Sequence, residues 1–214
     1  MVQEYLNSLP EDLRNLDLPL AADRPQWDAL PEAVRAALVR RGVEYRDFPW
    51  PALTCTDWLV FFRTGERTAF EDKYFPRRRA VCALALAECV RHDGQFLEPL
   101  TNGIWAICEE SAWQLPPHNN YIRDTAPLPL PDVDRPVPDL FACETAATLS
   151  LIRGLLGPEL EQAAPGLPGR IQTEIDRRVV QPYLRHHFWW MGNGDEPMCN
   201  WTAWCTQNVL LAVF

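Results

Sequence analysis

Positive charge is scarce in this sequence. It has 20 lysine and arginine residues against 29 aspartate and glutamate residues, which gives a formal net charge of −9 at pH 7. A general nucleic-acid binder needs a basic face, so this balance argues against such a partner. Long hydrophobic runs are missing too, since no stretch of about 18 apolar residues occurs. The sequence therefore does not indicate a membrane partner.

Motifs for phosphate or metal binding are also missing. The sequence has no P-loop and no G-x-G-x-x-G segment. His118, His186, His187 and Cys199 are the nearest approach to a ligand set, and they lack the C-x-x-C or H-x-x-x-H spacing of zinc sites. We therefore expect neither a metal nor another cofactor.

The cysteines indicate a reducing compartment. Their number, 7, is odd, and most of them lie in apolar helical contexts. This fits buried free thiols better than a disulfide framework. The start Met1–Tyr5 also lacks the basic segment and apolar core of a signal peptide. We expect a cytoplasmic protein.

Helical periodicity dominates the rest of the chain, of which 47% is hydrophobic. Apolar positions recur at helical spacing between glycine and proline breaks, whereas strand signals are weak. Gly42 and the pair Gly157–Pro158 are expected to end helices. The proline-rich segment 115–138 is expected to be a stiff, irregular loop. The expected helices span 31–41, 50–63, 71–92, 96–112, 139–156, 168–187 and 200–214.

This succession of helices predicts a single all-α domain over residues 1–214. An incomplete (α/α) toroid or barrel of helical hairpins is the natural candidate for its architecture. The closing run 209–214 is apolar and has no capping residue. We therefore expect the chain to be a fragment of a longer protein, with an apolar C-terminal helix that favours self-association.

Tryptophan is concentrated near the C-terminus, in the segments His186–Gly192 and Asn200–Cys205. Flat aromatic faces cover the apolar faces of sugar rings, while amides and imidazoles reach hydroxyls and carboxylates. Neighbouring Trp189 and Trp190 are expected to face opposite sides, one toward the core and one toward a cleft. The mixture predicts one wall of a carbohydrate-binding cleft.

A second candidate segment runs from Trp113 to Tyr121. Pro116 and Pro117 stiffen it, so that His118 and Asn119 are held in one direction. His118 is open to either of two interpretations, a functional group or a helix cap. Glu144, further along, either faces a cavity and holds a partner such as His118, or is an exposed carboxylate near a helix start.

Together these segments resemble the N-terminal helical part of heparinase II/III-like proteins, over roughly residues 105–214. The resemblance implies an incomplete toroid that a β-sandwich domain follows beyond this chain. It also implies β-elimination on a glycan that contains uronic acid. The motifs that carry it are Trp113 with 115–119, then 139–146, 188–192 and 200–205.

The resemblance also implies roles for particular residues. Asn200 matches the amide that neutralises the uronate carboxylate, and His118 is the second catalytic candidate. Trp201 departs from the family pattern, because many such lyases have histidine directly after that asparagine. A catalytic tyrosine is expected beyond Phe214, and no motif supports Tyr121 or Tyr183 instead. The expected substrate-binding residues are Trp113, Asn119, Glu144, Trp190 and Trp201.

Two other functions stay open. The first is an (α/α) glycoside hydrolase, which needs two carboxylates across a cleft. The second is a non-catalytic helical domain that binds glycans. In each case the expected partner is an acidic oligosaccharide or polysaccharide. The carboxylates available to a hydrolase are Glu109, Glu110, Glu144, Asp195 and Glu196.

Overall fold

The computed structural model describes residues 17–121, 126–192 and 195–213. Within these ranges every regular element is a helix and no strand occurs, so the predicted all-α class is confirmed. The longer helices are α3 (Glu32–Tyr45), α4 (Cys55–Thr64), α5 (Thr68–Arg91), α6 (Leu97–Cys108), α7 (Leu140–Ala163), α8 (Leu167–Ile175) and α10 (Asn200–Val213). Short helical segments are α2 (Arg24–Asp28), η2 (Pro116–His118), the π-helical η3 (Asp176–Val180), α9 (Gln181–Arg185) and η4 (Trp189–Met191).

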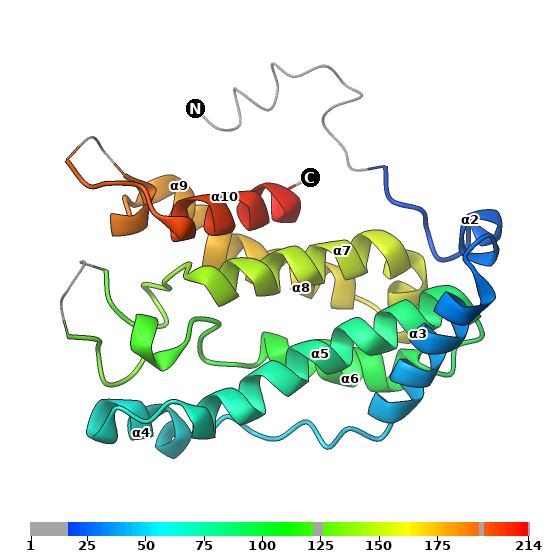
Figure 1. The fold of residues 1–214 in the computed structure, drawn as a ribbon, viewed down its shortest axis with the longest axis horizontal. Helices are drawn as coiled ribbons and strands as arrows, with labels where there is room; N and C mark the ends of the chain where they lie inside the picture. The colour runs from blue at the N-terminus through cyan, green and yellow to red at the C-terminus, as the bar shows by residue number, and fades with distance from the viewer. Residues whose placement is uncertain (1–16, 122–125, 193–194, 214) are drawn as a thin grey trace.

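The long helices run back and forth across the molecule. Figure 1 shows α5, α7 and α10 starting at the same end, on the left, while α6 and α8 return toward it. Helix α10 packs on α7, and α7 also contacts α5, α6 and α8. The described parts of the loop, 115–121 and 126–138, lie at that same left-hand end, near the starts of α7 and α10.

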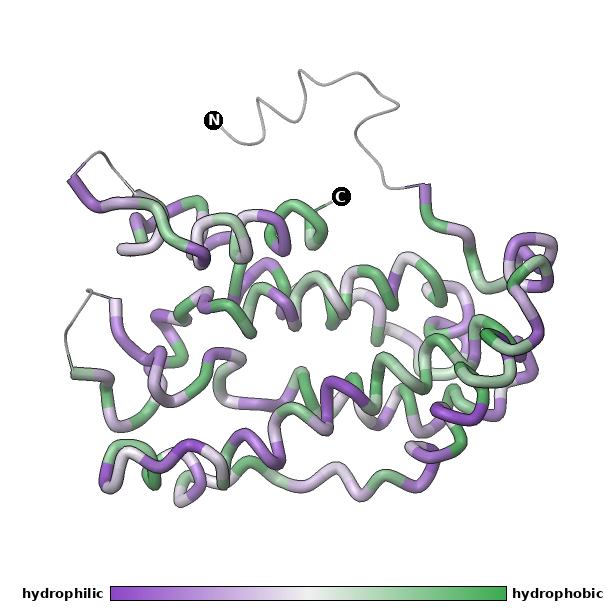
Figure 2. Tube along the Cα trace, viewed as in Figure 1, coloured by the Kyte–Doolittle hydropathy of each residue, from purple (hydrophilic) through white to green (hydrophobic). Residues whose placement is uncertain are grey.

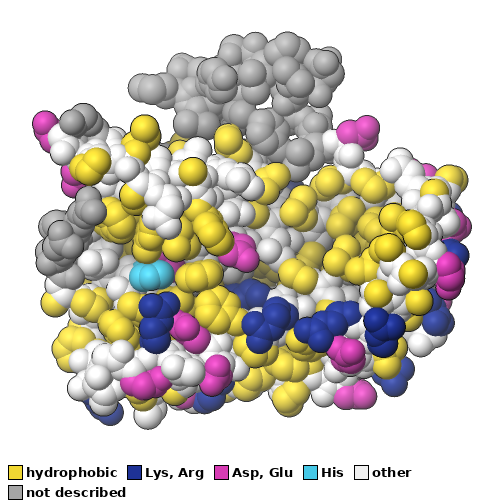
Figure 3. All heavy atoms as spheres, in the orientation of Figure 1, with side chains coloured by type: hydrophobic (Ala, Val, Ile, Leu, Met, Phe, Trp, Pro, Cys, Tyr) yellow, Lys and Arg dark blue, Asp and Glu magenta, His cyan; other side chains and the backbone are white. Residues whose placement is uncertain are grey.

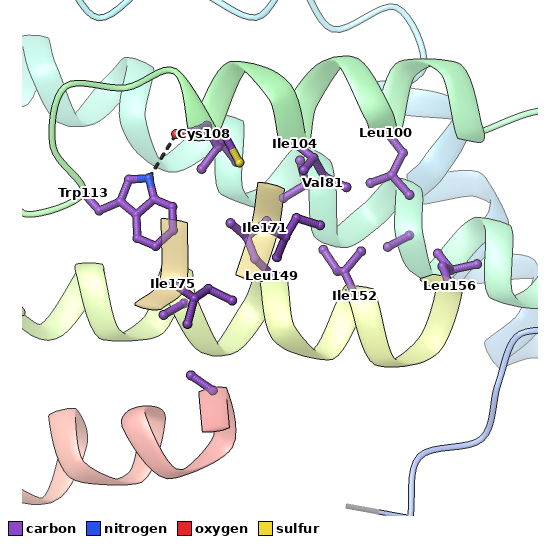
Figure 4. Packing of buried hydrophobic residues seen from close by; sticks show 14 of the residues in the cluster. Val81, Leu100, Ile104, Cys108, Trp113, Leu149, Ile152, Leu156, Ile171 and Ile175 are labelled. Atoms are coloured by element: carbon purple, nitrogen blue, oxygen red, sulfur yellow. Dashed lines mark hydrogen bonds between the residues drawn. The ribbon is translucent and has the colours of Figure 1, made fainter. Parts of the chain in front are cut away.

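One continuous core joins these helices (Figure 4). Leu149, Ile152 and Leu156 of α7 are buried in it, together with Ile104 of α6 and Ile171 of α8. Along the chain, α7 is largely hydrophobic, whereas the first half of α5 is hydrophilic (Figure 2). Helix α7 is therefore the central element, and α5 presents its polar first half to a surface.

Helix α7 is also long and apolar enough to cross a membrane by length and composition alone. Half of its most apolar 18-residue stretch is buried inside the protein. Four other helices pack around it, as expected for a core helix.

Gly42 does not end a helix, contrary to expectation. Helix α3 continues through it to Tyr45. A Cβ atom on Gly42 would lie 2.2 Å from the Cβ of Ala87 in α5, so the glycine is needed for close approach of the two helices. The start of the next helix was also predicted too early. Thr54 and Asp57 form a capping box, and α4 begins at Cys55 rather than at Trp50.

Two later helix ends also differ from expectation. Helix α7 passes Gly157–Pro158 and ends at Ala163, with a kink at Leu156, where φ is −127°. Because the helix bends at Leu156, it accommodates Pro158, which was expected to end it. The expected helix 168–187 is divided into α8, the π-helical segment η3 and α9. The chain becomes extended at His186, so the adjacent histidines follow the helix instead of forming its last turn.

Candidate functional site

Asp139 organises the end of the molecule where α7 begins. It is fully buried and is the N-cap of α7. Its Oδ1 accepts hydrogen bonds from the backbone N–H groups of Phe141 (3.1 Å) and Ala142 (2.7 Å). Its Oδ2 accepts one from the Leu115 N–H (3.1 Å) and lies 2.6 Å from Nδ1 of His118. One carboxylate thus fixes both a helix start and the loop that carries His118.

The His118 ring lies between two aromatic side chains. It is parallel to Phe141, with ring centroids 6.1 Å apart, and meets Trp201 of α10 edge to face at 4.6 Å. Its side chain is only 14% exposed. Its Nε2 has no hydrogen-bond partner in the described part of the chain. His118 therefore has one nitrogen held by Asp139 and one free.

Asn200 and Glu144 lie at the surface near this histidine. Asn200 is exposed at the start of α10, next in the chain to Trp201. Glu144 is exposed one turn after Phe141 on α7. Partial burial of its carboxyl raises the pKa of Glu144 against the attraction of Arg78, and the negative charge of Asp139 adds to the rise. Among the predicted site residues, the structure gathers His118, Trp201, Asn200 and Glu144 at one end of the molecule.

The other predicted residues lie in the interior. Trp113 is 1% exposed and donates its indole N–H to the Ile107 carbonyl at 3.0 Å (Figure 4). Trp190 is equally buried and stacks on Phe188 with centroids 5.9 Å apart. Asn119 is buried, and both its acceptor and its donors are used within the loop, on Gln114 and on the Leu128 and Leu130 carbonyls. Neither indole face nor the amide is presented to a substrate.

A groove of about 460 Å³ lies between α5 and α7. Phe141 lines it and also stacks on His118, so the groove and the histidine share a wall. The sequence analysis did not predict this groove, because its residues come together only when α3, α5 and α7 pack. The residues that give the groove its chemistry are Arg41, Tyr74, Phe75, Arg78, Arg79, Phe141, Glu144, Thr145 and Thr148.

The three groove arginines differ in how they are held. Arg78 donates to both carboxylate oxygens of Glu110, at 2.7 and 2.5 Å, and its guanidinium lies 3.4 Å over the Tyr74 ring. Arg41 pairs with Glu44. Arg79 is exposed and makes no hydrogen bond or ion pair within the described residues. Figure 3 shows a row of lysine and arginine side chains over α5 and α3, below a hydrophobic band that has one histidine at its end.

Arg78 of the groove belongs to a buried cluster of charged residues that also contains Arg77 and Glu110. Arg77 donates to Glu110 at 2.9 Å and to the carbonyls of Pro51 and Ala106. Two arginines thus share one carboxylate. Burial lowers the pKa of Arg77, against the attraction of Glu110. At Arg78, burial also opposes the charge, but Glu110 outweighs it and raises the pKa.

Three tyrosines lie in this part of the chain, and burial raises the pKa of two of them, Tyr74 and Tyr121. Tyr74 donates its hydroxyl hydrogen to the Trp113 carbonyl at 2.5 Å, and burial raises its pKa. Burial also raises the pKa of Tyr121 to about 12, and its hydroxyl is enclosed without a partner. The Tyr183 hydroxyl lies 3.5 Å from the Thr206 hydroxyl, on α9 and α10. The aromatic rings that contact His118 are those of Phe141 and Trp201, and none of these tyrosines is among them.

Possible metal ligands and thiols also occur in the described part of the chain. It holds no group of three or more His, Cys, Asp or Glu residues placed to bind a metal ion. All seven cysteines are free thiols, and four of them, Cys89, Cys108, Cys143 and Cys205, are buried. No protein-family model matches the sequence, and no curated protein matches it.

Proposed function

We propose that this chain is the N-terminal helical part of a lyase that cleaves a uronic-acid-containing oligosaccharide or polysaccharide by β-elimination. One observation carries the proposal: His118 is held by Asp139, packs on Trp201, the residue after Asn200, and stacks on Phe141, which lines an arginine-containing groove. The alternation of outward and returning helices also suits an incomplete (α/α) toroid.

The reaction needs three things from the protein. The proton α to the uronate carboxylate is weakly acidic, so a donor must neutralise the developing charge, and we assign this role to the exposed Asn200 amide. A base must take the proton, and the leaving oxygen must receive one. The C–H electron pair becomes the new carbon–carbon double bond, and the C–O bond to the leaving sugar breaks.

The groove supports an acidic substrate on a protein that is acidic overall. Arg79 is free to meet a carboxylate or sulfate, and Phe75 and Phe141 offer apolar faces to sugar rings. Trp201, which is partly exposed, extends this aromatic surface toward α10. The free thiols support our proposal that the protein works in the reducing cytoplasm.

The glycoside hydrolase is the weaker candidate. Glu144 is the only carboxylate that lines the groove among the described residues. Glu110 is engaged by Arg77 and Arg78, and Glu109 pairs with Arg170 at 3.0 Å. A pair of facing catalytic carboxylates, which hydrolysis requires, is not assembled there.

Incubation of the full-length protein with fragments of heparin, heparan, alginate and hyaluronan tests the proposal. We expect ultraviolet absorbance from an unsaturated uronate on at least one of them, and its loss in Asn200→Ala. A saturated sugar product would instead support the hydrolase. Binding without turnover across the panel would support a non-catalytic glycan-binding domain.

A further inference from the structure

We infer that Asp139 fixes the tautomer of His118 and thereby makes His118 the proton acceptor of the elimination. The inference rests on the proposed function. It differs from the expectation carried by the family resemblance, which places the base on a tyrosine beyond Phe214. Asp139 acts through His118, so it is a positioning residue rather than a catalytic one.

The hydrogen bonds that Asp139 accepts from the backbone determine which residue, Asp139 or His118, donates the hydrogen in the contact between them. Three backbone N–H groups, those of Leu115, Phe141 and Ala142, donate to its two oxygens. A carboxylate in this arrangement is an acceptor only. The His118 Nδ1 at 2.6 Å must therefore carry the hydrogen. In the neutral imidazole, Nε2 is then left with its lone pair.

The residues packed around His118 fix the orientation of its imidazole ring. Phe141 and Trp201 fix the plane of the imidazole, and the short helix η2 fixes its backbone. The His118 side chain is 14% exposed, and it stacks on Phe141, which lines the groove. When Nε2 takes the α-proton of the uronate, the buried carboxylate behind it stabilises the imidazolium, as in other histidine–aspartate pairs. The leaving oxygen takes its proton from water.

The tautomer is measured directly by ¹⁵N NMR of the histidine-labelled protein. The chain has 4 histidines, so the spectrum is simple, and His118→Gln assigns the His118 signals. We expect Nδ1 to be protonated in the wild-type protein. In Asp139→Asn, the amide oxygen must face the two α7 N–H groups and the NH₂ must face His118. We expect the His118 proton to move to Nε2.

The kinetic expectation follows from the tautomer. Asp139→Asn and His118→Gln should each lower kcat for elimination by roughly 10²- to 10⁴-fold, with little change in KM. Asp28→Asn makes the same chemical change at the end of α2, at the opposite end of the molecule in Figure 1, and should leave kcat unchanged. If Asp139→Asn does not fold, Asp139→Ser keeps a capping hydroxyl for α7 but removes the acceptor for Nδ1. Circular dichroism checks each variant.

The outcomes separate the inference from the proposed function. A proton on Nε2 in the wild-type protein would overturn the inference, as would full turnover in an Asp139→Asn protein whose tautomer has switched. A tautomer switch together with no unsaturated product from any glycan would leave the Asp139–His118 pairing standing. In that case the proposed function fails, and the proton-acceptor role fails with it.

Discussion

Glu110 shows how much a single buried side chain holds in place. Its side chain is 3% exposed and accepts from Arg77 and Arg78, whose side chains are 4% and 12% exposed. Removing one partner of a buried pair leaves an uncompensated charge, which costs about 3–5 kcal/mol. We expect Glu110→Gln to lower the free energy of unfolding by that amount, measured by urea denaturation.

The adjacent Glu109 provides a matched control for Glu110. Its side chain is 51% exposed and pairs with Arg170, which is itself 34% exposed. Exposed pairs contribute about 0–1 kcal/mol. Glu109→Gln should therefore leave the urea midpoint nearly unchanged. Equal effects of the two substitutions would mean that the Glu110 cluster is not what stabilises this region.

At the scale of elements, the approach of α3 to α5 depends on Gly42. The Cβ of an alanine there would overlap the Cβ of Ala87 at 2.2 Å and crowd the Phe96 ring at 3.2 Å. Overpacking of this kind costs about 1–3 kcal/mol, against a gain in helix propensity of at most about 1 kcal/mol. We expect Gly42→Ala to lower the melting temperature. Gly157→Ala in α7 meets no atom within 4 Å and should not lower it.

Helix α8 is tied to the end of α6 through Glu174. This buried carboxylate accepts from Arg170, Arg177 and Arg178, and Arg178 also donates to the Cys108 carbonyl at 3.0 Å. Burial opposes ionisation of Glu174, but the hydrogen bonds from Arg178 and Arg177 outweigh it and lower the pKa below the ordinary 4.5.

The lowered pKa of Glu174 fixes the sign of its pH dependence. A carboxylate with a lowered folded-state pKa stabilises the fold fully above 4.5 and loses that contribution as pH falls through the folded-state value. Glu174→Gln should therefore destabilise the protein at pH 7, by roughly 3 kcal/mol. The difference from wild type should narrow in urea titrations at pH 3. If the difference in unfolding free energy between wild type and Glu174→Gln did not change with pH, that result would contradict the lowered pKa of Glu174.

For the whole molecule, local sequence patterns predicted the helices better than their ends and contacts. The positions of α5, α6 and α10 followed from apolar periodicity, because burial of one face imposes that spacing. The prediction that Gly42 and Gly157–Pro158 end helices was wrong. Gly42 lies where α3 packs closely against α5, and a kink lets α7 continue through Pro158. The pairing of Asp139 with His118 has no sequence signal, because the two residues are 21 positions apart in an irregular part of the chain.

The charge of the whole molecule opposes the substrate that the groove is proposed to bind. A net charge of −9 repels an acidic glycan at long range, whereas Arg79 attracts it inside the groove. Salt screens both effects over about 8–10 Å. Because direct hydrogen-bonded contact exceeds diffuse repulsion in strength, we expect the affinity of the wild-type chain for uronate oligosaccharides to fall as salt rises.

Arg79→Gln separates the two electrostatic effects. Loss of one charge-assisted contact should weaken binding by roughly tenfold at low salt, about 1.5 kcal/mol. The remaining long-range repulsion should then make the affinity of the variant rise, or stay level, as salt increases. Arg63→Gln removes the same charge from α4, outside the groove, and should keep the wild-type salt dependence. Calorimetry at two ionic strengths measures both slopes. Parallel slopes for Arg79→Gln and wild type would show that the anion binds away from the groove.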